Sequence, residues 1–216
     1  MSIDNKNGRW YNMVKEYKAY KLFRIKKTEP GKIFPLFVDS DNETPIGEWV
    51  DAKCGERTDK GKVKSKLGEL CFRPGWHLSA DMPYVQHIGV KGSSGEIEFL
   101  NPNHVWCEVE YSTEINYQDI ANQNGINKNG ILIPKNAFLT YVPKNGYYKY
   151  KTNPNMYGEW IIAGSIKVNR ILLDEEVKSI CNEHGVEPLP RFGGEFNAAK
   201  YGFDEMIGEY KNEIAS

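Results

Sequence analysis

The clearest pattern along this chain is the alternation of apolar and polar residues at positions 105–111, Val-Trp-Cys-Glu-Val-Glu-Tyr. A period of two predicts a β-strand with one buried face. Residues 18–27 alternate more loosely and include aromatic side chains, which predicts a first strand that carries Arg24. The apolar run at 160–168 is rich in β-branched residues and predicts another strand late in the chain.

Several shorter segments between turn signals also predict strands. These segments are residues 33–38, 131–133, 138–142 and 146–150. The remaining patterns predict helices at 80–88, with Ser79 as N-cap, at 173–184, ended by Gly185, and in the tail at 196–214.

Many short strands with few helices and no regular βαβ alternation favour an α+β fold. We therefore expect one domain at residues 1–172, built on a split antiparallel or mixed sheet with short helices. A C-terminal helical extension at residues 173–216 is expected to pack on it. Residues 53–66 are rich in lysine and glycine, which predicts a mobile surface loop, either a lid or partner contact or simply a solvated loop. Residues 120–130 are rich in Asn and Gly and are expected to be irregular.

Composition narrows the functional classes. The 28 basic and 29 acidic residues give a net charge of −1, so no overall affinity for nucleic acid or membranes is expected. No apolar stretch has the length needed to span a bilayer. The N-terminus is polar without a signal-peptide pattern, and the four cysteines form no CxxC pair. These features predict a cytoplasmic protein with reduced thiols.

Two short motifs carry the candidate chemistry. His77 follows Pro74-Gly75-Trp76, so a turn and a tryptophan present its ring either to a substrate or to a structural hydrogen bond. Glu159 stands where a glycine-bearing loop becomes an apolar strand, and it is either a site carboxylate or a strand-end charge. Glu48, in a similar Gly-Glu-Trp context, is its rival. His104 lies in a polar loop and is expected to be solvated.

Other chemistries have little support in the sequence. There is no HExxH, CxxC or tight acidic cluster, so no metal site is predicted, and neither a P-loop nor GxGxxG is present. A group of tyrosines near Glu159, including Tyr147, either stacks a planar ligand or covers part of the core.

The order of three of these residues resembles the ADP-ribosyltransferase superfamily. Members carry Arg or His on a first strand, Ser, Tyr or His on a second strand after a glycine-containing turn and before a helix, and Glu at the start of a late strand. Arg24 in Leu-Phe-Arg-Ile, His77 in Pro-Gly-Trp-His-Leu-Ser and Glu159 in Gly-Glu-Trp-Ile-Ile-Ala follow this order. The wider sequence also looks like small proteins of bacteriophages and mobile elements, which implies a role in phage–host conflict.

The resemblance implies NAD as the substrate that donates ADP-ribose. Glu159 would stabilise the oxocarbenium-like ribose, and His77 would hydrogen-bond that ribose. The remaining cofactor-binding positions implied are Arg24 or Arg73 for the pyrophosphate, Tyr147 or Trp76 for nicotinamide stacking, and Ser79.

The acceptor would be a host protein or a nucleic acid, and the sequence does not choose between them or indicate an oligomeric state. Two other hypotheses remain open. The chain could be a non-catalytic phage accessory or anti-defence protein that binds a host protein or a nucleotide. It could also be a metal-independent nuclease with His77 as the base.

Overall fold

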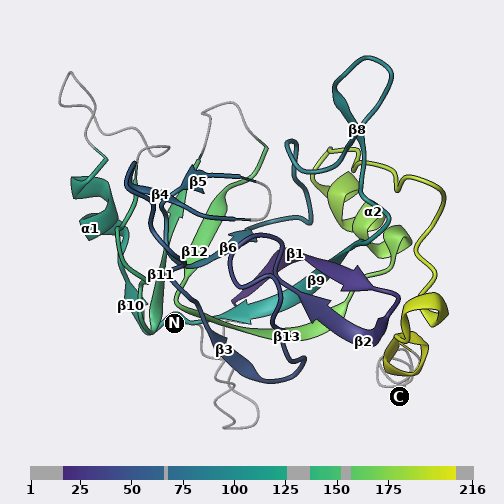
Figure 1. Cartoon of the computed structure of the whole chain (residues 1–216), viewed down its shortest axis with the longest axis horizontal. Helices are drawn as coiled ribbons and strands as arrows, with labels where there is room; N and C mark the ends of the chain where they lie inside the picture. Colours follow the sequence, from purple (N-terminus) through teal and green to yellow (C-terminus); the bar gives the residue numbers. More distant parts are fainter. Residues whose placement is uncertain (1–16, 66–67, 126–136, 152–156, 208–216) are drawn as a thin grey trace, which may run out of the picture.

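A nine-stranded mixed sheet forms the centre of the protein, in a computed structural model that describes residues 17–65, 68–125, 137–151 and 157–207 (Figure 1). The order is β10-β11-β12-β6-β1-β9-β13-β3, with β2 also paired to β1, and only the β10–β11 pair is parallel among these strands. The strands are β1 (Lys18–Lys26), β2 (Glu29–Phe34), β3 (Trp49–Asp51), β6 (Trp76–Ser79), β9 (His104–Tyr111), β10 (Ile115–Asn116), β11 (Gly146–Tyr150), β12 (Trp160–Ala163) and β13 (Ser165–Ile171). The predicted α+β fold is confirmed.

Smaller elements surround the sheet. Two antiparallel hairpins are formed by β4 (Lys62–Val63) with β5 (Leu70–Cys71), and by β7 (Val90–Lys91) with β8 (Ile97–Phe99). The helices are α1 (Gln118–Gln123), α2 (Asp174–Glu183) and the 3₁₀ turn η2 (Ala199–Tyr201). Within the described residues, no helix combines the length and apolar character needed to cross a membrane.

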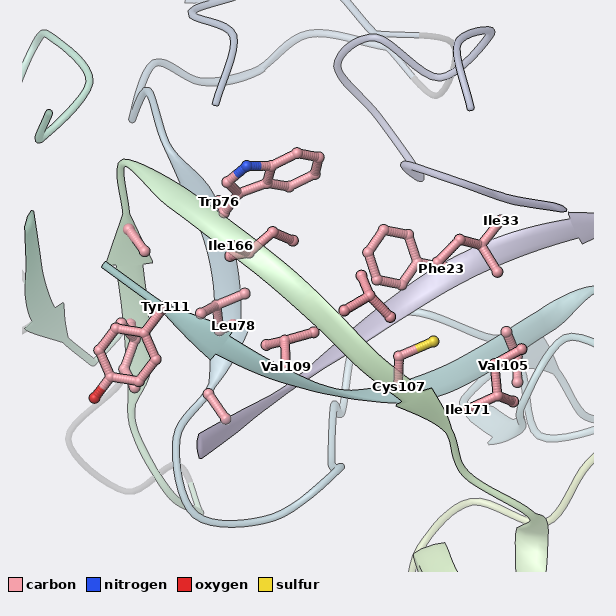
Figure 2. Packing of buried hydrophobic residues seen from close by; sticks show 14 of the residues in the cluster. Phe23, Ile33, Trp76, Leu78, Val105, Cys107, Val109, Tyr111, Ile166 and Ile171 are labelled. Carbon is pink, nitrogen blue, oxygen red and sulfur yellow. The ribbon is translucent and has the colours of Figure 1, made fainter. Parts of the chain in front are cut away.

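The alternating side chains of the strands build a hydrophobic cluster on each face of the sheet. One cluster includes Phe23, Leu78 and Val109, and Figure 2 shows it packed between β1, β6, β9 and β13. Phe203 of the C-terminal segment completes this cluster. The opposite cluster includes Trp106 and is covered by α2. Both α2 and the C-terminal segment that contains Phe203 therefore contribute to the core.

β6 and β2 share one edge of β1 and leave a notch between them. Tyr20 pairs with Ser79 of β6, and Arg24 pairs with Phe34 of β2, whereas the three residues between, 21–23, have no strand partner on this edge. The other edge of β1 is paired with β9 from Lys18 to Arg24 without interruption. The notch is where the sheet splits.

The helix predicted at 173–184 is confirmed as α2, with acidic residues in its first turn and Gly185 at a φ of 69° just beyond its end. The helix predicted at 80–88 is wrong. Ser79 belongs to β6, and its hydroxyl donates to the carbonyl of Met82 instead of accepting a helix N–H. Met82 and Val85 anchor this loop in the core, so packing decides its path.

The structure differs from other local predictions as well. Helix α1 ends at Gln123, within the segment 120–130 that was expected to be irregular, and residues 126–130 of that segment lie outside the described residues. Residues 138–142 form no strand, because the backbone N–H of Leu139 donates to the Tyr148 hydroxyl instead. The predicted strand at 131–133 lies outside the described residues. Part of the 53–66 loop forms β4, and the described part of the tail contains η2 and a helical turn at 204–207.

Candidate functional site

A cavity of about 670 Å³ lies beside the notch that β6 and β2 leave along the edge of β1. Binding sites for small molecules and cofactors typically measure roughly 300–1,000 Å³. Aromatic side chains from three strands, Trp106, Tyr150 and Trp160, form part of its wall. Segments 35–39, 50–54 and 85–89 contribute further lining residues. The cavity therefore combines a rigid sheet with loops that follow it.

His77 is held in the wall by the turn that precedes β6. Gly75 has a φ of 137°, and a Cβ there would lie 2.3 Å from Ile162 Cγ2, so this turn requires glycine. The indole N–H of Trp76 donates to the carbonyl of Val50 at 2.9 Å and fixes the start of β6. The His77 ring meets the Tyr150 ring edge to face, with centroids 6.4 Å apart.

The hydrogen bonding of His77 defines which nitrogen faces a ligand as an acceptor. Its Nδ1 lies 3.2 Å from the Gly75 carbonyl, which can only accept, so Nδ1 carries the proton. Burial, followed by the charges of Lys21 and Arg73, lowers the pKa of His77 to about 4, against the opposing effect of the Gly75 hydrogen bond. The ring is neutral at pH 7, and Nε2 keeps a lone pair that can accept a proton from a hydroxyl group.

Two cations accompany His77 at this end of the cavity. Lys21 Nζ donates to the His77 carbonyl at 3.2 Å, bridging the notch where a strand hydrogen bond would otherwise lie. The Arg73 guanidinium lies over the Tyr150 ring, 4.5 Å from its centroid. Desolvation lowers the pKa of Lys21 to about 8. The sequence analysis did not identify Lys21 as a site residue. Its position was nevertheless a signal, because Lys21 shares a strand face with Ala19 and Phe23, which are fully buried.

The structure separates the residues that the sequence analysis grouped into one site. His77, Arg73 and Trp76 line the cavity, whereas Arg24, Ser79, Tyr147 and Glu159 are not among its lining residues. The Ser79 hydroxyl is engaged with backbone carbonyls. Tyr147 packs against Tyr111, with ring centroids 5.3 Å apart, on the opposite face of the sheet.

Arg24 and Glu159 lie toward opposite ends of their strands. Trp160, Ser79 and Tyr20 are direct neighbours across β12, β6 and β1, so Glu159 lies level with Ala19. Arg24 is five positions further along β1, which is about 16 Å at ~3.3 Å per residue. Arg24 donates to the Ser40 carbonyl, and Glu159 is half-buried, 3.5 Å from Lys149 Nζ.

A second histidine, His104, lines the cavity although it was expected to be solvated. It is half-buried because it begins β9 and pairs with Arg24 of β1. Burial lowers its pKa to about 4, and Arg191 and Arg24 act in the same direction. His104 is therefore a neutral ring at pH 7.

Among the residues described, no three His, Cys, Asp or Glu side chains are grouped in a way that could hold a metal ion. The cavity wall carries three histidines, His77, His87 and His104, together with the cations Lys21 and Arg73 and several aromatic side chains. A third cation of the wall, Lys53, is paired with Asp39. Such a set suits an anionic ligand that also carries hydroxyl groups and a planar ring. No protein-family model, curated protein or solved structure matches the chain.

Proposed function

We propose that this chain is an ADP-ribosyltransferase-like enzyme that binds NAD in the cavity beside the notch. The observation that carries the proposal is the sheet order. Arg24, His77 and Glu159 lie on or at the start of β1, β6 and β12, which are far apart in sequence but consecutive neighbours in the sheet. The resemblance rests on motif order alone, and the adjacency of these strands is an independent observation that supports it.

The cavity supplies groups that match the parts of NAD. Trp160 offers an aromatic surface for a planar ring, and Arg73, which lies over Tyr150, offers a charge-assisted donor for phosphate oxygens. Nε2 of His77 is free of the backbone hydrogen bond that occupies Nδ1, and it can accept a hydrogen bond from a ribose hydroxyl. NAD would be the donor, and a host protein or nucleic acid the acceptor.

Glu159 is the proposed carboxylate for the transfer step. Its side chain is 34% exposed, and Lys149 is its ion-pair partner at 3.5 Å. An exposed pair of this kind is worth about 1 kcal/mol or less, so Glu159 can exchange Lys149 for a developing positive charge at modest cost. Its role would be electrostatic stabilisation of the ribose as nicotinamide leaves.

The test follows labelled ADP-ribose from NAD into protein and nucleic acid, using purified protein in host-cell lysate. The wild type should transfer the label, and Glu159→Gln should lose the transfer. Glu48→Gln is the matched control, because Glu48 also stands between Gly and Trp but is exposed and precedes β3, which is separated from β12 by four strands in the sheet. An absence of label, together with no rise in melting temperature on adding NAD, would overturn the proposal.

A non-catalytic nucleotide-binding protein is the second candidate. It is favoured by the absence of Arg24 and Glu159 from the residues that line the cavity. In that case NAD or another nucleotide would raise the melting temperature of the wild type and of Glu159→Gln equally, without label transfer. No observation on the described residues favours the nuclease hypothesis.

A further inference from the structure

Lys21 and Arg73 are cations in the cavity wall without an acidic partner. Within the described part of the chain, no carboxylate forms an ion pair with either side chain. The ammonium group of Lys21 donates to a backbone carbonyl, and the guanidinium of Arg73 contacts an aromatic ring, so neither charge is neutralised. Lys21 contacts the His77 backbone carbonyl, and Arg73 lies over Tyr150, whose ring meets the His77 ring edge to face. The two cations therefore place two positive charges in the part of the cavity wall that contains His77.

The acidic residues of the cavity wall are engaged elsewhere or lie at its rim. Asp39 pairs with Lys53 at 2.6 Å, and Glu43 pairs with Lys32 at 2.8 Å. Asp51 is exposed at the end of β3. The thiol of Cys107, directly across from Lys21 on β9, has a pKa raised by burial, so it stays protonated and supplies no counter-charge.

Both cations are held in fixed positions. Lys21 Nζ is anchored by the His77 carbonyl and lies 5.0 Å from the Trp76 ring centroid and 5.4 Å from that of Phe23. Arg73 is held over Tyr150. A neutral side chain could also donate a hydrogen bond across the notch, so this bond alone does not require a lysine. A buried charge without a charged partner is unfavourable unless a ligand neutralises it.

We propose that Lys21 and Arg73 form an anion subsite that binds the pyrophosphate of the nucleotide ligand. This inference rests on the proposed function in taking NAD as the ligand. It assigns the pyrophosphate to Lys21 with Arg73, and it excludes Arg24, which is turned toward Ser40. His77 lies beside the subsite, so a ribose hydroxyl next to the pyrophosphate can reach its Nε2.

Isothermal titration with NAD, ADP-ribose, inorganic pyrophosphate and nicotinamide riboside tests the subsite. Lys21→Met and Arg73→Gln should each weaken binding of ADP-ribose and pyrophosphate at least about ten-fold, which corresponds to the loss of one charge-assisted contact. Binding of nicotinamide riboside, which lacks the pyrophosphate, should change much less. Lys21→Arg should retain most of the affinity.

Lys167→Met is the matched control. Lys167 also lies near a tryptophan, 6.0 Å from the Trp49 ring centroid, but it has a carboxylate partner in Glu110 at 3.1 Å and lies outside the cavity wall. The Lys167→Met variant should bind each ligand with the same affinity as the wild type. Circular dichroism and melting curves establish that each variant is folded, and Arg73→Gln serves on its own if Lys21→Met does not fold.

The outcomes separate the two proposals. If the wild type binds ADP-ribose and pyrophosphate through Lys21 but transfers no label, the subsite stands and the transferase fails. If folded Lys21→Met and Arg73→Gln bind ADP-ribose as tightly as the wild type, the subsite is wrong even where label transfer succeeds. If the wild type binds neither ADP-ribose nor pyrophosphate, both proposals are overturned.

Discussion

Replacing Lys21 by methionine should make the ligand-free protein more stable at pH 7. The pKa of Lys21 falls from its ordinary 10.5 to about 8 because the surrounding protein desolvates the ammonium group. A difference of about 2.5 pKa units corresponds to about 3.4 kcal/mol, at ~1.36 kcal/mol per unit. Water reaches part of the side chain through the cavity, so this value is an upper bound.

Methionine removes the charge but also removes favourable contacts. The hydrogen bond to the His77 carbonyl is worth about 1 kcal/mol, and the cation–ring contacts with Trp76 and Phe23 add about 0.5–1 kcal/mol. A thioether recovers part of the ring contact. The net gain in the free energy of unfolding is therefore about 1–2 kcal/mol, or about 2–8 °C in melting temperature.

The pH dependence supplies the sign of the effect. Because the folded pKa of Lys21 is lowered, the unfolded chain binds more protons between about pH 8 and 10.5, and wild-type stability gains over this window as pH rises. The advantage of Lys21→Met should be full below pH 8 and shrink above it. Urea unfolding of both proteins at pH 7 and pH 9.5 measures this difference. A variant less stable than the wild type at pH 7, or a difference independent of pH, would refute the reasoning.

Three further predictions concern the same framework. The pKa of His77 is lowered from 6.5 to about 4, so the free energy of unfolding of the wild type should fall by up to about 3 kcal/mol as pH falls through this window. His77→Asn should lose less stability over the same window, as measured by urea unfolding at pH 7 and pH 4.5. Gly75→Ala places a Cβ 2.3 Å from the Ile162 side chain of β12, at a φ of 137°, and should lower the free energy of unfolding by about 3 kcal/mol. Gly95→Ala, which has open space at a φ of 83°, should lower it by about 1 kcal/mol. Equal melting temperatures of the two variants would contradict this prediction. Arg191, whose side chain is 4% exposed, donates to both carboxylate oxygens of Asp174 at 2.8 and 2.7 Å, so Arg191→Met should cost about 3 kcal/mol or more in thermal unfolding.

Strand positions could be predicted from the sequence wherever alternation was strong. Residues 105–111 lie in β9, and residues 18–27 nearly coincide with β1, because each strand has one face that must be buried. The helix expected at 80–88 failed for the opposite reason. Its apolar residues are anchored in the core from an extended loop, so tertiary packing overrides the local pattern that Ser79 and Pro83 suggested.

The candidate site was only partly predictable. Motif order placed Arg24, His77 and Glu159 on the correct kind of element, but the register between strands decides which side chains meet, and register depends on pairings distant in sequence. The resemblance implied Arg24 for the pyrophosphate, but Arg24 donates to the Ser40 carbonyl. The better signal was Lys21, a charge on the face of β1 that otherwise carries Ala19 and Phe23.

The notch in the edge of β1 has a consequence for how the sheet opens. Among the described residues, the half formed by β10, β11, β12 and β6 is joined to β1 by one strand pair, Tyr20–Ser79, and by the hydrogen bond from the Lys21 side chain to the His77 carbonyl, whereas β1 and β9 are paired along seven residues. Local opening follows the weakest backbone connection. Amide protons of β6 that face β1 should therefore exchange with solvent long before those between β1 and β9, so the sheet behaves as two leaves that separate along a single seam.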